Sequence, residues 1–262
     1  MLQKLILQAV DFKKMNCAFI IKSLGTGEAA TYNPDQKIPS ASLIKLPIMA
    51  ETIRQVKEGK LRLQERLGVK AEDKVAFSIL TMLETGNQYS LQDLLTLMIV
   101  QSDNTAANIL IHKVGMDNIN DFCIDYKMRN TVLERKMMDT QARKAGRENF
   151  TSASDMAGFL ERLYLGEIID RASSTYMLEI MKKQLENSMM RLYIPDETLI
   201  AHKTGELDGI SHEAGIVYLE KNDYIFVVSI WNALSNNEAR QTIGKISKIV
   251  YDYFSCDKTL KS

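Results

Sequence analysis

The chain has 262 residues, which is enough to bury a sizeable core in one large domain or in two smaller ones. Hydrophobic residues make up 45% of the sequence and charged residues 25%, as in an ordinary globular protein. The 33 lysines and arginines equal the 33 aspartates and glutamates, so bulk charge gives no reason to expect a nucleic acid or an anionic membrane as partner.

The N-terminal segment predicts an amphipathic helix over residues 1–14, because its apolar run is too short for the core of a signal peptide. No apolar run in the chain reaches the roughly 18 residues of a membrane span. Cys17, Cys123 and Cys256 are odd in number and far apart, which is typical of free thiols in a reducing compartment. These features favour a cytoplasmic protein, or one exported by a signal that precedes this sequence.

The predicted elements change in kind along the chain. Strand and turn signals predict a hairpin near the N-terminus, helical periodicity dominates the middle, and strands return late before a last helix. The predicted strands span 17–23, 28–34, 198–205, 213–220 and 223–232, and the predicted helices span 43–58, 90–100, 104–115, 152–166, 170–185 and about 238–254.

Strands at both ends with helices between them predict an α/β (α+β) fold, in which the two chain ends build one antiparallel sheet flanked by helices. We expect an α/β lobe from residues 1–37 and 186–262 and an all-helical lobe from residues 38–185, together forming one catalytic domain. A cleft is expected where the lobes meet.

A long irregular segment, residues 132–149, lies between two well-patterned helices. Loops of this length without secondary structure are usually functional or disordered. Apolar residues at Val132, Leu133, Met137 and Met138 indicate that this one is ordered.

Three short motifs could carry chemistry. In the first, Ser42-Leu-Ile-Lys45, a serine at a helix start is followed one turn later by a lysine on the same face. Such a lysine acts as a base only if burial or nearby cations lower its pKa. Taken alone, Ser42 is more typical of a helix cap than of a nucleophile.

The other two motifs are Ser102-Asp103-Asn104, between two predicted helices, and Lys203-Thr204-Gly205, in a late strand. Alone, the first reads as a helix cap and the second as a strand end with a turn glycine.

Together, in this order and spacing, the three motifs are the signature set of the penicillin-recognising serine enzymes. Over roughly residues 15–255 the chain resembles the class A β-lactamases. The resemblance implies the β-lactamase/D-Ala-D-Ala-peptidase fold, and it is carried best by SASLIKLPIMAE and VQSDNTAANIL.

The resemblance implies catalytic roles for three residues. Ser42 matches the nucleophile that forms an acyl-enzyme, Lys45 its activating amine, and Ser102 the hydroxyl that passes a proton to the leaving nitrogen. Asp103 would be structural. The backbone amides of Ser42 and Glu206 would form the oxyanion hole.

It also implies substrate contacts. Asn104 matches the amide that holds the substrate's side-chain carbonyl. Lys203 and Thr204 match the groups that attract the substrate carboxylate, and Gly205 would let the strand approach the substrate closely.

The loop departs from the family pattern. Aligning Leu133 and Arg135 with the family's Leu-x-Arg-x-Glu places Met137 where a glutamate activates the deacylating water, and a thioether cannot take a proton from water. Glu134 and Asp139 are nearby candidates for that role, although neither is aligned with the position. The chain thus resembles an atypical member of the family, whose Ω-like loop, residues 131–151, lacks the glutamate.

A second departure is His212, which lies where class A enzymes often have a carboxylate-binding arginine. It could hydrogen-bond the substrate carboxylate, or it could be satisfied by Glu213 or by backbone at the lobe interface. Neither His112 nor His202 shows the spacing of a metal site, so we expect no metal and no cofactor.

The sequence therefore predicts a monomeric serine hydrolase that β-lactams acylate at Ser42 and that deacylates slowly. Two alternatives stay open. One is a D-alanyl-D-alanine carboxypeptidase or a related peptidase or esterase, which works on a D-Ala-D-Ala-type peptide without the loop glutamate. The other is a penicillin-binding sensor that never turns over.

Overall fold

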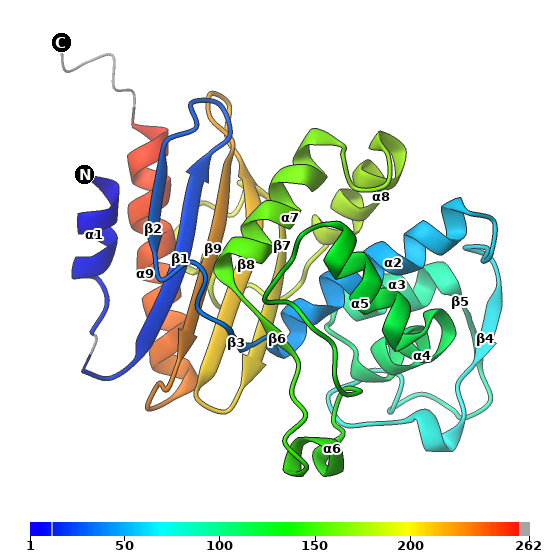
Figure 1. Cartoon of the computed structure of the whole chain (residues 1–262). Helices are drawn as coiled ribbons and strands as arrows, with labels where there is room; N and C mark the ends of the chain where they lie inside the picture. Colours follow the sequence, from blue (N-terminus) through cyan, green and yellow to red (C-terminus); the bar gives the residue numbers. More distant parts are fainter. Residues whose placement is uncertain (12, 257–262) are drawn as a thin grey trace.

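A five-stranded antiparallel sheet forms the centre of the protein (Figure 1). The computed structural model describes residues 1–11 and 13–256. In the sheet order β2-β1-β9-β8-β7, two strands from the N-terminal end lie beside three strands from the C-terminal end, which confirms the predicted fold class. The strands are β1 (Asn16–Ser23), β2 (Ala29–Tyr32), β7 (Leu199–Leu207), β8 (Ile210–Tyr218) and β9 (Tyr224–Trp231).

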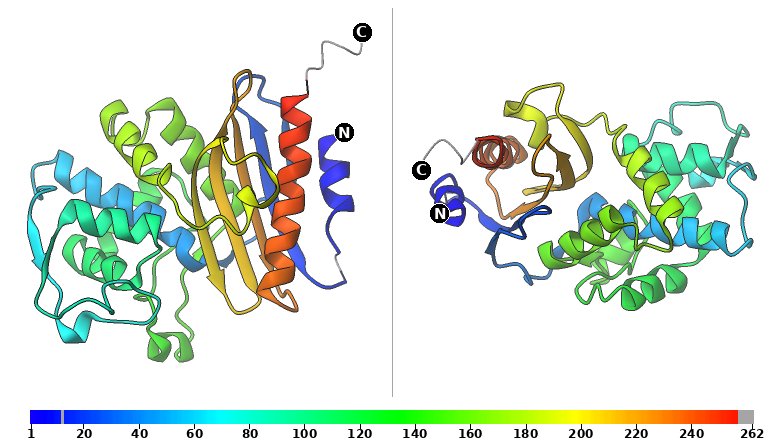
Figure 2. Two further views of the ribbon diagram at one scale, coloured as in Figure 1. Left: turned by 180° about the vertical axis from the view of Figure 1, so that it is seen from behind. Right: turned by 90° about the horizontal axis from the view of Figure 1, so that it is seen from above.

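Helices cover both faces of this sheet. The short α1 (Leu2–Gln8) and the long α9 (Asn236–Ser255) lie side by side on one face, and α7 (Ala153–Leu165) lies on the other (Figure 2). The N-terminal helix is shorter than predicted, and residue 12 of its predicted range lies outside the described residues.

The middle of the chain forms a helical region beside the sheet, as predicted (Figure 1). Several small elements and helix α5 were not predicted from the sequence. The larger helices are α2 (Lys45–Lys57), α3 (Leu91–Val100), α4 (Asn104–Val114), α5 (Met116–Asp125) and α8 (Arg171–Met181). The smaller elements are β3 (Ile38–Pro39), β4 (Arg66–Gly68), β5 (Gln88–Ser90), β6 (Phe150–Thr151), α6 (Thr140–Lys144) and the 3₁₀ turns η1 (Ala41–Ile44), η2 (Ala71–Asp73) and η3 (Met190–Tyr193).

The proposed lobe boundaries at 37/38 and 185/186 stay a prediction, and residues 257–262 of the predicted sheet lobe lie outside the described part of the chain. In that described part, no helix is long and apolar enough to cross a membrane.

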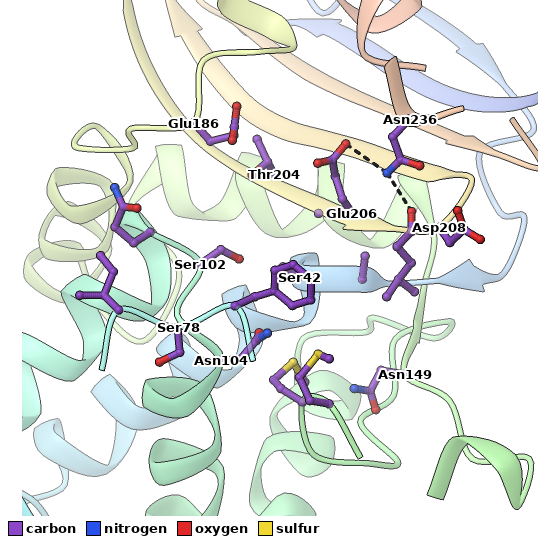
Figure 3. A pocket seen from close by; sticks show the side chains of 18 of the residues that line it. Ser42, Ser78, Ser102, Asn104, Asn149, Glu186, Thr204, Glu206, Asp208 and Asn236 are labelled. Atoms are coloured by element: carbon purple, nitrogen blue, oxygen red, sulfur yellow. Dashed lines mark hydrogen bonds between the residues drawn. The ribbon is translucent and has the colours of Figure 1, made fainter. Parts of the chain in front are cut away.

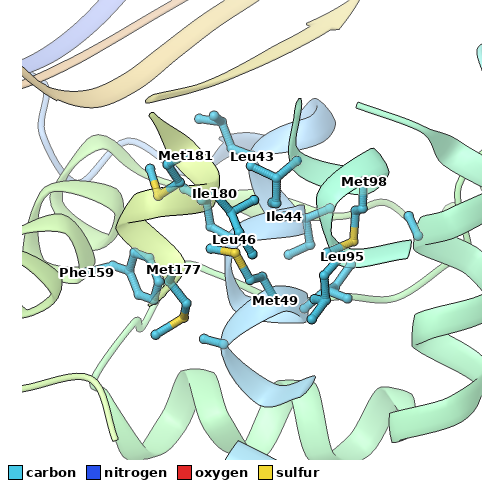
Figure 4. Close-up of a cluster of buried hydrophobic side chains, with 14 of the residues drawn as sticks. Leu43, Ile44, Leu46, Met49, Leu95, Met98, Phe159, Met177, Ile180 and Met181 are labelled. Atoms are coloured by element: carbon cyan, nitrogen blue, oxygen red, sulfur yellow. The ribbon is translucent and has the colours of Figure 1, made fainter. Parts of the chain in front are cut away.

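Two apolar clusters hold the layers together. One fills the space between the sheet and helices α1 and α9. The other surrounds α2 and joins the helical region to the opposite sheet face (Figure 4). Helix α2 is buried on nearly all sides, so the turn that precedes it is fixed in position. Strand β7 is the edge strand that contacts this turn.

The second cluster predicts a large difference between two substitutions on one helix. Phe159, on α7, is 1% exposed, whereas Leu165 at the end of the same helix is 47% exposed. Phe159→Ala should lower the free energy of unfolding by about 3–5 kcal/mol, because it leaves a cavity in the core. Leu165→Ala should change it by less than about 0.5 kcal/mol. Urea unfolding curves measure both, and equal losses would contradict this account of the core.

Candidate active site

A cavity of about 890 Å³ lies where the turn η1, the edge strand β7, the turn before α4 and the long loop meet (Figure 3). The structure brings most of the sequence-predicted residues to it. Those that line the cavity are Ser42, Ser102, Asn104, Met137, Asp139, Thr204, Gly205 and Glu206.

The turn η1 presents Ser42 to the cavity. Ala41, directly before it, has a φ of 47°, a left-handed conformation that is uncommon for a residue with a side chain and is often found at functional sites. Ser42 is not a helix cap, since it lies inside the 3₁₀ turn and its Oγ is 3.1 Å from Lys45 Nζ. Helix α2 starts at Lys45, and Pro47 falls in its first turn, where proline is tolerated.

Lys45 is completely buried and reaches across to α4. Its Nζ donates to Asn104 Oδ1 at 2.7 Å and to the Ser102 carbonyl oxygen at 2.5 Å. It also lies 3.1 Å from both Ser42 Oγ and Ser102 Oγ. Burial, and then the nearby Lys203 ammonium, hold the pKa of Lys45 well below its usual value.

In its neutral form, Lys45 would have a lone pair available to a hydroxyl proton. A neutral amine has two N–H donors and one lone pair. The Ser102 carbonyl and Asn104 Oδ1 are acceptors only, so in that form they would take the two hydrogens. The lone pair can therefore accept the proton of Ser42, which is how a nucleophilic serine is activated.

The turn before α4 presents the second hydroxyl. Ser102 has a φ of 53°, and Asp103 Oδ1 caps α4 by accepting from the amide of Ala106 at 2.8 Å. Asp103 also accepts from Ser78 Oγ at 2.7 Å and from the amide of Leu80 at 3.1 Å, so the structure gives it the structural role expected.

Lys203 lies under the cavity on the other side of Ser102. It is fully buried, and its Nζ donates to Ser102 Oγ at 3.0 Å and to the Thr204 carbonyl at 2.8 Å. Burial lowers the pKa of Lys203 to about 7, although the carboxylates of Glu213 and Glu186 act in the opposite direction. Ser102 Oγ thus lies between two amines and can pass a proton.

Gly205 is required by the close approach of β7 to the nucleophile turn. A Cβ atom at this position would lie 3.0 Å from the Ser42 amide nitrogen and 3.2 Å from the Cβ of Ala41. Any larger residue would push the strand away from η1. The close approach that the structure shows is thus between β7 and η1, and the expected close approach of Gly205 to a substrate stays a prediction.

The long loop is ordered and closed at its neck. The Asn149 side chain accepts from the amides of Glu134 and Arg135 at 2.8 and 3.0 Å and donates to the Arg135 carbonyl at 3.1 Å. Arg135 forms an ion pair with Glu148, with Nε 2.9 Å from Oε1. A loop whose ends meet and whose side chains pack inside it is an Ω-loop.

Met137 is held at the cavity by its backbone. Asn108, one turn after Asn104 on α4, accepts from the Met137 amide at 2.7 Å and donates to its carbonyl at 3.0 Å. The Met137 side chain is 7% exposed and belongs to the apolar core. Met138 was expected to anchor the loop to the core, but it is 38% exposed and lines the cavity.

The two candidate water-activating carboxylates differ in position. Glu134 is exposed, accepts from the Glu148 amide at 3.2 Å and is not among the cavity-lining residues. Asp139 lines the cavity, but its Oδ1 accepts from the Ala142 amide at 2.8 Å and caps α6. The structure therefore removes Glu134 from the site and gives Asp139 a capping bond.

His212 does not face the cavity, in contrast to the sequence expectation. It is fully buried, and its Nε2 donates to the Pro39 carbonyl at 2.8 Å. Burial lowers the pKa of His212 to about 4, so the ring is neutral at neutral pH and cannot attract a carboxylate by charge. Glu213 instead accepts from His202, with Nδ1 2.9 Å from Oε1.

Sequence reasoning missed several residues in or beside the cavity, of which three matter most here. Asn108 had a signal, because it follows Asn104 by one helical turn and shares its face. Phe77, which is 80% exposed at the cavity with a φ of 57°, had none in an irregular segment. Arg240 on α9 also lines the cavity, and nothing in the sequence connects it to the motifs.

Comparison with known proteins agrees with this geometry. The sequence profile of the β-lactamase enzyme family matches residues 2–254. The chain belongs to the β-lactamase enzyme family. The β-lactamases CARB-3 and PSE-4 of Pseudomonas aeruginosa are 25% and 26% identical to this family member, over 87% of its length and 82% of theirs.

Solved structures of similar proteins share the fold of this family member. The β-lactamase of Sphaerobacter thermophilus is 28% identical, with a TM-score of 0.89 over 97% of both chains. PBP-A is also 28% identical, with a TM-score of 0.89 over 97% of this chain and 96% of its own. The family and fold implied by the three motifs are thereby confirmed.

The lowered pKa of Lys203 predicts a pH-dependent stability. In the unfolded chain the ammonium keeps the ordinary pKa of 10.5, so between about pH 7 and that value the unfolded state binds more protons. The free energy of unfolding should therefore rise with pH in this window, by at most about 1.4 kcal/mol per pH unit. Relative to Lys203→Met, the wild-type protein should gain stability between pH 7 and about pH 9 in urea unfolding. Identical pH profiles would show that Lys203 stays charged.

Proposed function

We propose that the protein is a serine acyl-enzyme hydrolase that β-lactams acylate at Ser42 and that releases the acyl group slowly. The single observation that carries acylation is the contact of Ser42 Oγ, at 3.1 Å, with a buried lysine amine that also bonds the Ser102 carbonyl and Asn104 Oδ1. In this role Lys45 takes the Ser42 proton as Oγ attacks the lactam carbonyl carbon.

The rest of acylation uses groups already in place. As the lactam C–N bond breaks, Ser102 Oγ gives its proton to the nitrogen and regains one from Lys45 or Lys203, both within 3.1 Å. The outer edge of β7 lies beside the nucleophile turn, so the Glu206 amide can join that of Ser42 in stabilising the oxyanion. Thr204 lies at the cavity for the substrate carboxylate, with Lys203 below it.

Slow release is supported by Met137, the loop residue whose backbone is bonded by Asn108 of α4. Hydrolysis of an acyl-enzyme requires a base that takes a proton from water. Asn108 holds the backbone of Met137 there, but the side chain that follows is a thioether. We therefore propose that acylation proceeds and deacylation limits turnover.

One similar protein provides a chemical precedent. A leucine-to-glutamate mutant of PBP-A has been solved as an acyl-enzyme complex with penicillin G. Because that complex is of PBP-A, for the present chain it only suggests penicillin G as the first reagent to test.

Exposure to penicillin G should add one penicilloyl group to the wild-type protein, measured by intact mass. Ser42→Ala should remain unmodified, because the nucleophile is gone. Ser154→Ala, in which a serine at the start of α7 is changed, serves as a matched control and should be labelled like wild type. No adduct on wild type, or an adduct on Ser42→Ala, would refute the proposal. Release of D-alanine from a D-alanyl-D-alanine peptide would instead identify a peptidase.

Met137→Glu should shorten the lifetime of the adduct. The substitution places a carboxylate on a backbone already fixed by Asn108, and a positioned general base contributes roughly 10²- to 10⁴-fold. Decay of the penicilloyl adduct, followed by mass after removal of free penicillin, measures the effect. Met137→Gln is the matched control, because it has similar size and polarity but no basic carboxylate. Equal lifetimes in Met137→Glu and Met137→Gln would contradict this account of the loop.

A further inference from the structure

An ion pair forms part of the cavity wall contributed by the sheet. Glu206 on β7 and Arg240 on α9 both line the cavity. Arg240 Nε donates to Glu206 Oε1 at 2.8 Å and Nη2 donates to Oε2 at 2.5 Å, a bidentate arrangement. Figure 3 shows Glu206 beside Asn236 above Ser42.

Glu206 is held in place by further donors. Its Oε1 accepts from Ser211 Oγ at 2.9 Å and lies 3.4 Å from Asn236 Nδ2. Asn236 also bonds the turn between β7 and β8, through the Leu207 carbonyl at 2.9 Å and the Gly209 amide at 2.9 Å. Burial would raise the pKa of Glu206, but the hydrogen bonds from Arg240 and Ser211 outweigh it and lower the pKa, so the carboxylate is ionised.

The other arginines of the cavity lie on the opposite wall. Arg135 and Arg143 belong to the Ω-loop, and both pair with Glu148. On the sheet wall, the arginine that lines the cavity is therefore Arg240. It bonds Glu206, whose neighbour Gly205 lies against the nucleophile turn. The Arg240 side chain is 37% exposed, so a bound anion could pair with it if Glu206 did not already do so.

The oxyanion-hole residue thus carries a side chain that neutralises the nearest guanidinium. An anionic group bound at Thr204 would meet a pair with no net charge, and it would lie near the Glu206 carboxylate. Removal of either partner would leave one unit of charge on the wall, positive or negative.

We infer that the Glu206–Arg240 pair sets the charge specificity of the site, because Glu206 masks Arg240 and so weakens selection for substrates that carry a carboxylate beside the scissile bond. This inference rests on the proposed acylation of Ser42. It assigns a specificity-determining function to two side chains, separate from the backbone role of Glu206 in the oxyanion hole.

The test compares penicillin G with its methyl ester, which has the same ring and no carboxylate charge. The second-order rate constant for acylation of Ser42 is measured by intact mass for both reagents, and their ratio cancels general effects on the nucleophile. The variants are Glu206→Gln, Arg240→Gln and the double variant, with Glu161→Gln, which breaks the ion pair with Lys22 outside the cavity, as the matched control.

The ratio of acid to ester should follow the charge of the wall. Glu206→Gln should raise it by about fivefold and Arg240→Gln should lower it by a similar factor, as expected for one charge near a partly exposed site. The double variant and Glu161→Gln should resemble wild type. These differences should shrink at high ionic strength, because salt screens exposed charges.

An unchanged or lowered ratio in Glu206→Gln, or a raised ratio that persists in the double variant, would overturn the inference. If Glu206→Gln fails to fold by circular dichroism, Glu206→Ala carries the same expectation. If wild-type Ser42 is labelled but the acid-to-ester ratio is the same in all variants, this inference alone is refuted. The absence of any adduct on wild type refutes the proposed function, and this inference with it.

Discussion

The burial of the Lys45 amine is the constraint on which the site depends. Its Nζ connects the turn η1, through Ser42, to the start of α4, through Ser102 and Asn104. A second buried amine, Lys203, lies on the other side of the same Ser102 hydroxyl. It is unfavourable for both lysine amines to be protonated in such surroundings, because desolvation and mutual repulsion disfavour the charged forms. The fold therefore favours the neutral form of an amine beside a serine, which is a combination suited to acyl transfer.

The same constraint explains why the two halves of the reaction can be separated. Acylation needs groups that come from η1, α4 and β7, and these elements are fixed by the apolar core around α2. Under the proposed function, release of the acyl group would use a base from the Ω-loop, which is a separate segment closed by Asn149 and the Arg135–Glu148 pair. The loop keeps its position through Asn108 even though Met137 offers no base. A site can therefore retain the first step while the second is weakened.

Much of this arrangement could be predicted from the sequence, because it rests on local signals. The motifs at Ser42, Ser102 and Lys203 are short, and their residue types are restricted by the chemistry they perform. The sheet built from both chain ends followed from strand patterns that are absent from the middle. The irregular loop was identified by its lack of periodicity, and its apolar residues correctly indicated order, although Met138 faces the cavity and not the core.

What could not be predicted depends on contacts between distant segments. His212 is aligned with the carboxylate-binding position of the family. Its ring nitrogen instead donates a hydrogen bond to the Pro39 carbonyl on another strand, and burial keeps the ring neutral. Arg240 lies on a helix with no motif, and only the fold places it against Glu206.

The positions of His212 and Arg240 are related. A histidine that is buried and neutral leaves the sheet wall without a cation on β8, and the guanidinium on α9 that could replace it is neutralised by a glutamate on β7. Under the proposed function and the inferred masking of Arg240, the sheet wall would control which substrate charge is accepted, and the loop wall would control how long the acyl group stays. Because the two walls belong to different elements and share no hydrogen bond between Met137 and the Glu206–Arg240 pair in the described part of the chain, substrate selection and product release can change independently of each other.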